Sequence, residues 1–253
     1  MIQESTVGII PARYASTRFP GKPLVDIGGK SMIQRVYEQA SIALKWVYVA
    51  TDDERIFKAV VQFGGKAVMT SPDHQSGTDR CTEALDQIEK LENRTFDVVI
   101  NVQGDEPFIE PELLTTLAGC FHSSVTEIAT LVKPLRNKAD LFDSNKPKVI
   151  FNPNYEAIYF SRSPIPYLRQ FPKEEWADNH NYYLHIGLYG YRSDILREIT
   201  NLKPSTLEIA ESLEQLRWLE NGYNISVRSV DHDSIGIDTP EDLERVIHSG
   251  LPQ

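Results

Sequence analysis

This sequence has few cysteines, no long apolar run and fewer positively than negatively charged residues. The only cysteines, Cys81 and Cys120, lie far apart without a CxxC partner, which argues against a structural zinc site or a disulfide framework and fits a reducing cytoplasm. No apolar run approaches the roughly 20 residues that a membrane span needs. The first residues also lack the basic segment and long apolar segment of a signal peptide. We therefore expect a soluble, cytoplasmic protein.

The deficit of positive charge restricts the possible partners. Lysine and arginine total 26 against 36 aspartate and glutamate residues, which gives a formal net charge of -10. Binding to nucleic acid or to an anionic membrane draws on counterion release by Lys and Arg, so neither partner is expected. Cations that gather locally in such an acidic chain are instead candidates for binding a small anionic ligand.

Two common nucleotide-binding signatures are absent. The pattern G-x-x-x-x-G-K-[ST] would place a glycine five residues before Gly29, but Leu24 stands there. No G-x-G-x-x-G follows the first apolar run either, so the dinucleotide fingerprint is missing. A nucleotide, if one binds, must be held by other groups.

The order of apolar patterns predicts an α/β fold. Strand-like runs alternate with helical patterns up to about residue 121, which implies right-handed βαβ crossovers and a Rossmann-like, mainly parallel sheet with helices on both faces. Strands are predicted at 7–10, 46–51, 66–70 and 97–102, and helices at 31–44 (with Ser31 as N-cap), 53–63 and 78–91.

After Phe121 the rhythm changes, and strand-like runs separated by Pro- and Asn-rich turns suggest antiparallel strands. Two helices, over 207–221 and 240–249, flank a last strand at 224–230. Since no linker is visible, we expect a single domain over 1–253 with a β-rich excursion at about 150–192.

The loop after the first strand gathers cations. In open α/β sheets ligands lie beyond the carboxyl ends of the strands. Gly21 permits a close approach of the backbone, and the charged and hydroxyl groups suit a polyphosphate. A solvated loop with scattered salt bridges is an equally good interpretation. The residues concerned are Arg13, Ser16, Thr17, Arg18 and Lys22.

Two aspartates are candidate magnesium ligands. Asp105 lies three residues past a strand, where a carboxylate could bind Mg²⁺, although G-D-E-P also makes a good turn by itself. Asp238 precedes Thr239 and Pro240, which are typical of the N-cap and first position of a helix. If Thr239 is the cap, Asp238 is available to the same metal. The alternative is that Asp238 itself caps the helix.

The segment Ser71–Arg80 is rich in hydrogen-bonding groups, including Gln75, Ser76 and Arg80. It could contact the edge of a base, or it could be a turn into a helix capped by Thr78. The segment Glu214–Trp218 is typical of an ordinary amphipathic helix.

Eight segments, in order along nearly the whole chain, resemble one family. They are IPARYASTRFPGKPL, ATDDERI, DHQSGTDR, NVQGDEPFI, YFSRSPIP, HIGLYGYR, LEQLRWL and GIDTPEDLERV. The family is 3-deoxy-manno-octulosonate cytidylyltransferase, the CMP-Kdo synthetase of Gram-negative bacteria. The departures, Phe19 for an aliphatic residue and Ser31 for a common proline, bear little on the chemistry.

This resemblance implies a nucleotidyltransferase-type fold and magnesium-dependent transfer of CMP from CTP to 3-deoxy-D-manno-octulosonate (Kdo), giving CMP-Kdo and diphosphate for lipopolysaccharide biosynthesis. It also implies a homodimer in which the β-rich excursion contributes to the interface. By resemblance, Arg13, Ser16, Thr17, Arg18 and Lys22 hold the phosphates, and Gln75, Ser76 and Arg80 surround the cytidine. Asp105 and Asp238 hold Mg²⁺ and, with Lys22, are catalytic, while Gln103, Arg162, His185, Tyr189, Glu214 and Gln215 bind the sugar acid.

Two alternatives remain open at this point. The acceptor could be another sugar acid, such as 8-amino-Kdo or a sialic acid. The chain could also be an inactive regulator that binds a nucleotide sugar, although the presence of both Asp105 and Asp238 argues against it.

Overall fold

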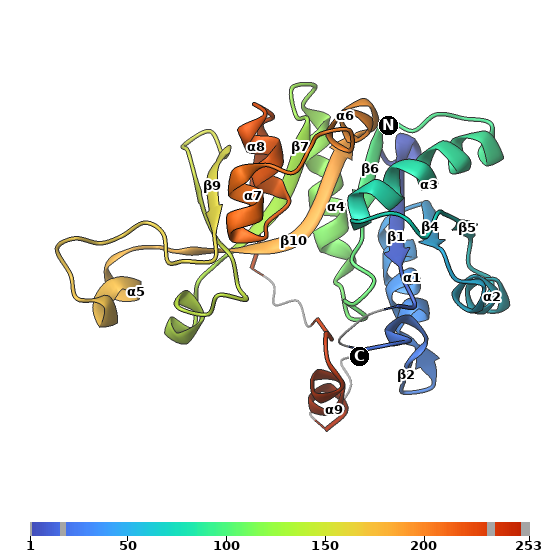
Figure 1. Cartoon of the computed structure of the whole chain (residues 1–253), viewed down its shortest axis with the longest axis horizontal. Coiled ribbons are helices and arrows are strands. Elements are labelled where there is room, and N and C mark those ends of the chain that lie inside the picture. The colour runs from blue at the N-terminus through green and yellow to red at the C-terminus, as the bar shows by residue number, and fades with distance from the viewer. Residues whose placement is uncertain (1, 16–18, 232–235, 249–253) are drawn as a thin grey trace. The chain divides into compact units, whose positions relative to one another are not determined.

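The computed structural model describes residues 2–15, 19–231 and 236–248. The chain forms two compact units, Met1–Gly119 with Asp233–Gln253 and Cys120–His232, and Figure 1 labels many of their elements. We call them the first and second units and describe each by itself. The boundary at Cys120 lies where the sequence rhythm changes, and the interpretation of 1–253 as one domain stays a prediction.

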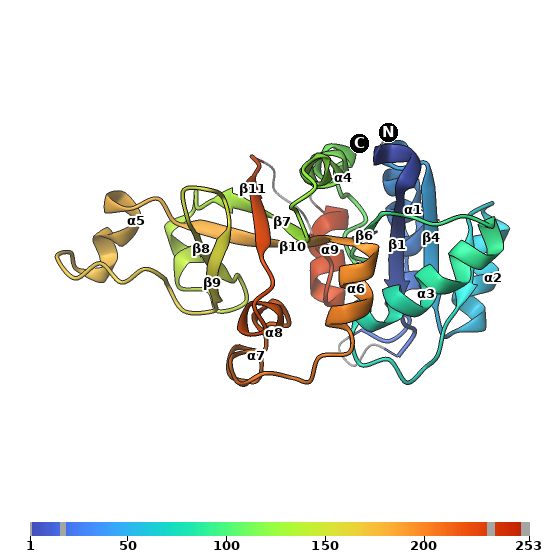
Figure 2. The same cartoon turned by 90° about the horizontal axis from the view of Figure 1, so that it is seen from above.

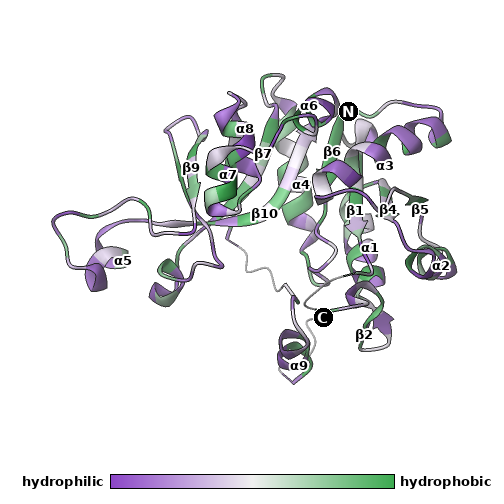
Figure 3. Cartoon of the chain, viewed as in Figure 1, coloured by the Kyte–Doolittle hydropathy of each residue, from purple (hydrophilic) through white to green (hydrophobic). Residues whose placement is uncertain are grey.

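The first unit is built on a parallel sheet. Its strands β1 (Thr6–Ala12), β4 (Trp46–Thr51), β5 (Ala67–Met69) and β6 (Val98–Asn101) lie in the order β6-β1-β4-β5, and every pair is parallel, as predicted. A small antiparallel pair, β2 (Asp26–Ile27) and β3 (Lys30–Ser31), lies outside this sheet. The central strands are apolar and buried because helices cover them, and β6 is hydrophobic in Figure 3.

Helices cover both faces of this sheet. Figure 2 shows α3 and α4 on opposite sides of β6, and α1 packs against α4. The predicted cap of α1 is confirmed, since the Ser31 hydroxyl accepts a hydrogen bond from Gln34 N at 3.4 Å. The helices of the first unit are α1 (Met32–Ala43), α2 (Glu54–Gln62), α3 (Gly77–Glu92), α4 (Pro111–Gly119) and α9 (Pro240–His248).

The start of α3 differs from the cap proposed at Thr78. Ser76 is the N-cap, and its hydroxyl accepts from Asp79 N while the Asp79 carboxylate accepts from Ser76 N. This reciprocal pair is a capping box, and it starts the helix at Gly77, ahead of the predicted position.

Strand β1 continues past Pro11, where we expected a strand end. Pro11 and Ala12 pair with Ala50 and Thr51 of β4. On the other side β6 ends opposite Ile9, whose carbonyl accepts from Val102 N at 2.9 Å. Pro11 lies two residues beyond Ile9 and so faces the same side, where β6 supplies no partner for an N–H. A proline is therefore tolerated there.

The second unit is β-rich, as predicted, but begins well before residue 150. Strand β10 is antiparallel to β7 and β8, and β8 is antiparallel to β9, whereas β11 runs parallel to β7. Val227 N donates to Tyr155 O at 2.7 Å, so the chain leading into β9 meets β11 and the strands curl into a ring. The strands are β7 (Ile128–Pro134), β8 (Lys148–Phe151), β9 (Ala157–Ser161), β10 (Tyr183–Arg192) and β11 (Ile225–Ser229).

The helix expected over 207–221 is two helices. Ser212 has φ 51° and ends α7, while α8 begins three residues later. A left-handed residue cannot continue an α-helix, and the helical periodicity of the sequence does not reveal it. The helices of this unit are α5 (Trp176–Asn179), α6 (Ser193–Ile199), α7 (Thr206–Glu211) and α8 (Gln215–Glu220). Its 3-10 turns lie at Cys120–His122, Lys138–Leu141 and Lys173–Glu175, and those of the first unit lie at Ile2–Ser5 and Lys22–Leu24.

Gly104 provides the first testable prediction. A Cβ at Gly104 would lie 3.0 Å from the backbone oxygen of Pro11, which is too close for ordinary packing. We expect Gly104→Ala to lower the free energy of unfolding by about 1–3 kcal/mol, because strand β1 would have to shift. Gly187→Ala is the control, since nothing lies within 4 Å of its Cβ. Equal urea unfolding midpoints for the two variants would contradict this reading.

Candidate active site

The order of the strands defines where a ligand should bind. From β1 the chain crosses through α1 to β4 on one side, and from β5 it returns through α3 to β6 on the other side of β1. The crossovers therefore diverge between β1 and β6, and such a switch point leaves a crevice at the carboxyl ends of the strands. The loop after β1 carries Lys22, and the loop after β6 carries Asp105.

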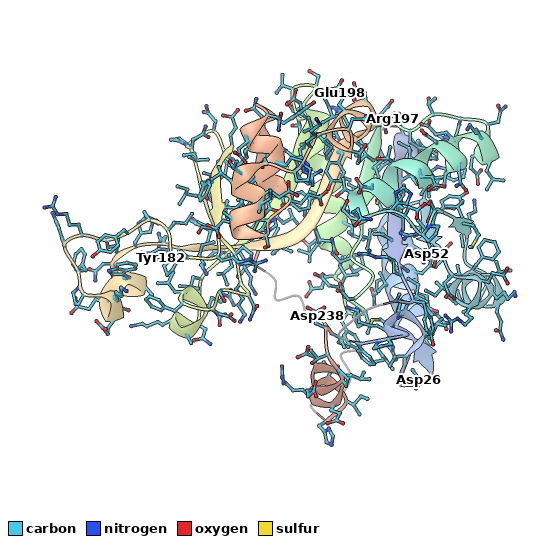
Figure 4. All side chains as sticks on the ribbon, in the orientation of Figure 1. Asp26, Asp52, Tyr182, Arg197, Glu198 and Asp238 are labelled. Atoms are coloured by element: carbon cyan, nitrogen blue, oxygen red, sulfur yellow. The ribbon has the colours of Figure 1, made fainter. Side chains whose placement is uncertain are left out.

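Lys22 joins the two predicted metal ligands. Its Nζ lies 2.9 Å from Asp105 Oδ2 and 3.1 Å from Asp238 Oδ1. Asp238, labelled in Figure 4, lies just before α9, and Ile237 N donates to Asp105 O at 2.9 Å. Three segments distant in sequence thus meet at one cation, and the two carboxylates are brought together as the sequence predicted.

The carboxylate of Asp238 is not used to cap α9. The Thr239 hydroxyl accepts from Asp242 N at 3.2 Å, and Asp242 Oδ2 accepts from Asp238 N and Thr239 N at 3.1 and 3.0 Å. Thr239 is therefore the cap, as predicted. The helix is held by its apolar side, where Ile237 and Val246 join a cluster with Ile27 and Met32.

The residues predicted around the cytidine make hydrogen bonds and an ion pair within the protein itself. Gln75 donates to Asp73 O at 2.8 Å, and Ser76 caps α3. Arg80 is only 1% exposed, ion-paired to Asp52 at 2.8 Å and hydrogen-bonded to the Thr70 hydroxyl. Figure 4 labels Asp52, directly after β4, while Thr70 follows β5. The Arg80 guanidinium thus ties two strand ends together, and its contact with cytidine stays a prediction.

Of the remaining phosphate-binding candidates, the structure describes only Arg13. Arg13 directly follows β1 and is exposed. Ser16, Thr17 and Arg18 lie outside the described residues.

In the second unit, a bulge in β10 brings two sugar-binding candidates together. Residues four apart in a regular strand are separated by about 13 Å, but the rings of His185 and Tyr189 lie 5.3 Å apart. The register with β7 shifts between Ile186 and Tyr189. The buried Thr130 hydroxyl donates to Leu188 O at 2.8 Å inside this bulge. Bulges commonly redirect side chains beside functional sites.

His185 is neutral. Protein groups crowd the imidazole, and this desolvation lowers its pKa to about 3. Its Nε2 lies 3.0 Å from Thr130 Oγ1. Because that hydroxyl donates its own proton to the chain, we assign the proton of the ring to Nε2. Nδ1 is then an acceptor suited to a hydroxyl of a ligand.

The start of α8 borders the same cluster. The Tyr189 ring packs edge-on against Trp218 at 5.0 Å, and burial, followed by the nearby Glu214 carboxylate, raises the pKa of Tyr189 well above its usual range. Gln215, one helical turn before Trp218, is buried, and its amide nitrogen has no hydrogen-bond partner among the described residues. An unsatisfied buried donor at this place is a candidate ligand contact.

The two remaining sugar-binding candidates are Arg162 and Gln103. Arg162 donates to three backbone carbonyls, those of Glu211 at 2.6 Å, Ser144 at 2.9 Å and Ser212 at 3.1 Å. It therefore fixes the break between α7 and α8. Gln103 follows β6 in the first unit.

Thr130, Asn101 and Tyr14 lie among or beside the candidate site residues but were not predicted from the sequence. Asn101 ends β6 at the switch point, and its buried Oδ1 has no hydrogen-bond partner in the described part of the chain. A polar residue that ends a buried strand is a visible signal for Asn101. Thr130 lies between the apolar residues Ala129 and Leu131 of β7 and gives no signal, because its role depends on a bulge in a different strand.

Comparison with known proteins defines the class. The model of the cytidylyltransferase family matches residues 7–228, and the chain belongs to this family of nucleotidyltransferases. Among its relatives, the 3-deoxy-manno-octulosonate cytidylyltransferase of Parabacteroides distasonis is 59% identical, over 95% of this chain and 96% of that protein. The enzyme of the same name from Bacteroides thetaiotaomicron is 60% identical, over 94% of this chain and 95% of that protein.

Solved structures agree. CMP:2-keto-3-deoxy-manno-octonic acid synthetase complexed with CTP is similar with a TM-score of 0.88 and 44% identity, over 97% of this chain and 98% of that chain. The 4-diphosphocytidyl-2C-methyl-D-erythritol synthase of Anaerococcus prevotii matches with a TM-score of 0.61 at 12% identity, over 98% of this chain and 97% of that chain. The second likeness shows the shared fold alone.

The lowered pKa of His185 predicts how stability depends on pH. In the unfolded chain the pKa of this histidine is about 6.5. Below that pH the unfolded chain takes up a proton that the folded protein, in which the pKa of His185 is about 3, does not. Stability therefore falls as the pH drops from 6.5, by up to about 1.4 kcal/mol per unit from this group.

We expect His185→Gln to show a shallower loss of unfolding free energy between pH 6.5 and 4.5 than the wild type, measured by urea titration. His180→Gln, at an exposed histidine, is the control and should keep the wild-type slope. Identical slopes for His185→Gln and the wild type would rule out a neutral, desolvated His185.

Proposed function

We propose that this protein transfers CMP from CTP to Kdo, giving CMP-Kdo and diphosphate. The observation that carries the proposal is the contact of Lys22 with Asp105 and Asp238 at the switch point of the sheet. The named relatives, up to 60% identical over nearly the whole chain, support Kdo as the acceptor. They do not favour another sugar acid or an inactive regulator.

In this reaction the anomeric hydroxyl oxygen of Kdo bonds to the α-phosphorus of CTP. The bond from that phosphorus to the bridging oxygen breaks, diphosphate leaves with the bond electrons, and the hydroxyl loses its proton. Such a transfer leaves little covalent work for the protein, so positioning and charge neutralisation dominate. Lys22, with Arg13 and the loop between them, supplies positive charge for the phosphates.

The two carboxylates fit a magnesium ion. One oxygen of each lies about 3 Å from a single positive centre, the Lys22 ammonium, and hard carboxylate oxygens are the donors that Mg²⁺ prefers. No larger group of His, Cys, Asp or Glu suited to a metal occurs in the ranges that the structure describes. Asp105 and Asp238 would hold Mg²⁺, which lowers the pKa of a bound hydroxyl and neutralises phosphate charge.

The cluster in the second unit suits a polyhydroxy acid. The Nδ1 acceptor of His185, the phenol of Tyr189 and the amide nitrogen of Gln215, which has no partner among the described residues, can each bond to a hydroxyl. A few fixed polar groups among buried rings are typical of small-molecule sites. We include Glu214 and Arg162 in the proposed sugar-binding set of this unit, with Arg162 acting through the backbone that it holds, and a contact of Gln103 in the first unit with the sugar stays a separate prediction.

We also propose a homodimer and a role in lipopolysaccharide biosynthesis, in the cytoplasm. Tyr155 lies in the turn between β8 and β9 and is 51% exposed, and Ile158 lies in β9 and is 57% exposed. Such exposed apolar side chains support contact with a second copy of the chain. Among the described residues, no helix is both long and apolar enough to cross a membrane.

The aspartate assignments can be tested by turnover. We expect Asp105→Asn and Asp238→Asn each to lower kcat at least about 100-fold, because each removes a full negative charge from the proposed magnesium site. Release of diphosphate from CTP and Kdo is the measurement. Asp26→Asn is the matched control, because Asp26, labelled in Figure 4, is exposed and an asparagine can still accept from Gly29 N. Near-wild-type turnover in either test variant would remove that residue from the site.

Binding of a metal without nucleotide gives a test independent of activity. The Lys22 ammonium neutralises both carboxylates, so its loss should strengthen their attraction for a divalent cation. We expect Lys22→Met to bind Mn²⁺ at least about tenfold more tightly than the wild type, measured by the electron paramagnetic resonance signal of free Mn²⁺. Lys30→Met, at a half-exposed lysine paired with Glu38, is the control. Equal or weaker binding by Lys22→Met would contradict the shared site.

A further inference from the structure

Tyr14 follows Arg13 in the loop after β1, and its ring is stacked on the guanidinium of Arg55. The Arg55 guanidinium carbon lies 3.3 Å from the centroid of the Tyr14 ring. A planar guanidinium stacks well on an aromatic face, which combines dispersion with cation–π attraction.

Arg55 is fixed in place by Asp53. Asp53 Oδ1 accepts from Arg55 Nε at 3.0 Å, and Oδ2 accepts from Nη2 at 2.7 Å. Asp53 is also the N-cap of α2, and its own backbone N donates to the hydroxyl of Thr51 at 3.2 Å. Thr51 is the buried last residue of β4. The guanidinium is thus anchored to the edge of the sheet.

Gly21 contacts the same ring. Its N donates to Tyr14 O at 3.0 Å. It has φ 74°, and a Cβ at this position would lie 3.2 Å from both Cζ and the hydroxyl oxygen of Tyr14. The backbone at Gly21 therefore approaches the ring more closely than a residue with a side chain could, and Lys22 follows directly.

We propose that Tyr14 is a positioning residue for Lys22. Its ring holds Gly21 in register with the edge of the sheet, through Arg55 and Asp53, so that the Lys22 ammonium stays beside Asp105 and Asp238. A lysine side chain has many rotamers, and a fixed starting point reduces the freedom that it loses when it binds phosphate. The inference rests on the proposed function, because its consequence is measured on CTP.

A role that passes through Lys22 differs from a general contribution to folding. Tyr14→Leu should weaken CTP binding at least tenfold, because Arg55 and Gly21 lose the ring between them. Tyr14→Phe keeps the ring and should stay within twofold of the wild type. Since Tyr14 acts through Lys22, the pair Tyr14→Leu with Lys22→Met should bind CTP no more weakly than Lys22→Met alone.

The experiment is a double-mutant cycle on the dissociation constant for CTP, measured by calorimetry in the full chain, with the melting temperature of every variant recorded. Additive losses in the double variant would overturn the proposal, as would wild-type binding by Tyr14→Leu or equal losses in Tyr14→Leu and Tyr14→Phe. A wild type that does not bind CTP at all would instead overturn the proposed function.

If Tyr14→Leu does not fold, Arg55→Met decides the question, because Arg55 is 58% exposed and its substitution leaves the core intact. We expect it to weaken CTP binding about threefold. In the Lys22→Met background it should have no further effect. An unchanged dissociation constant in Arg55→Met would overturn the proposal.

Discussion

The contact of the Lys22 ammonium with two carboxylates is the interaction on which the rest of the site depends. Asp105 and Asp238 are far apart in sequence, 83 and 216 residues from Lys22. Two carboxylates this close repel each other, and a shared cation converts the repulsion into attraction. The same arrangement of charge supports the proposed metal on the carboxylate side and the proposed phosphate contacts on the lysine side.

Several features of the first unit serve this contact. The divergence of crossovers places the loops after β1 and β6 side by side, and Gly104 lets the second loop pass close to Pro11. Thr239 caps α9 and leaves the carboxylate of Asp238 for Lys22. The buried ion pair of Arg80 ties strand ends at the same edge of the sheet, and its cost in desolvation is offset by a second hydrogen bond to Thr70.

Much of the fold follows from local patterns, because strands and helices of the first unit each have one buried face and clear caps. Ser31 is a cap that the sequence alone identifies, whereas the structure decides between Thr239 and Asp238 in favour of Thr239. The strand end at Pro11 and the single helix over 207–221 were wrong, since the first depends on where β6 ends and the second on the left-handed Ser212. Local sequence determines neither of these.

The site was predictable only in part. The loops that carry Lys22 and Asp105 are recognisable as the ends of strands, and Asp238 as the residue before a helix cap, but only the family resemblance assigns them chemical roles. The burial of Arg80 and the hydrogen bonds of Thr130 within the β10 bulge arise from contacts between distant segments. No spacing of residues along the chain encodes such contacts.

The most direct test of the proposed site at Lys22, Asp105 and Asp238 is a crystal structure with CTP and Mn²⁺, in which anomalous scattering locates the metal. We expect carboxylate oxygens of both Asp105 and Asp238 to ligate Mn²⁺, while Lys22 Nζ contacts a phosphate oxygen of CTP. A metal bound without either carboxylate, or Lys22 directed away from the nucleotide, would contradict it.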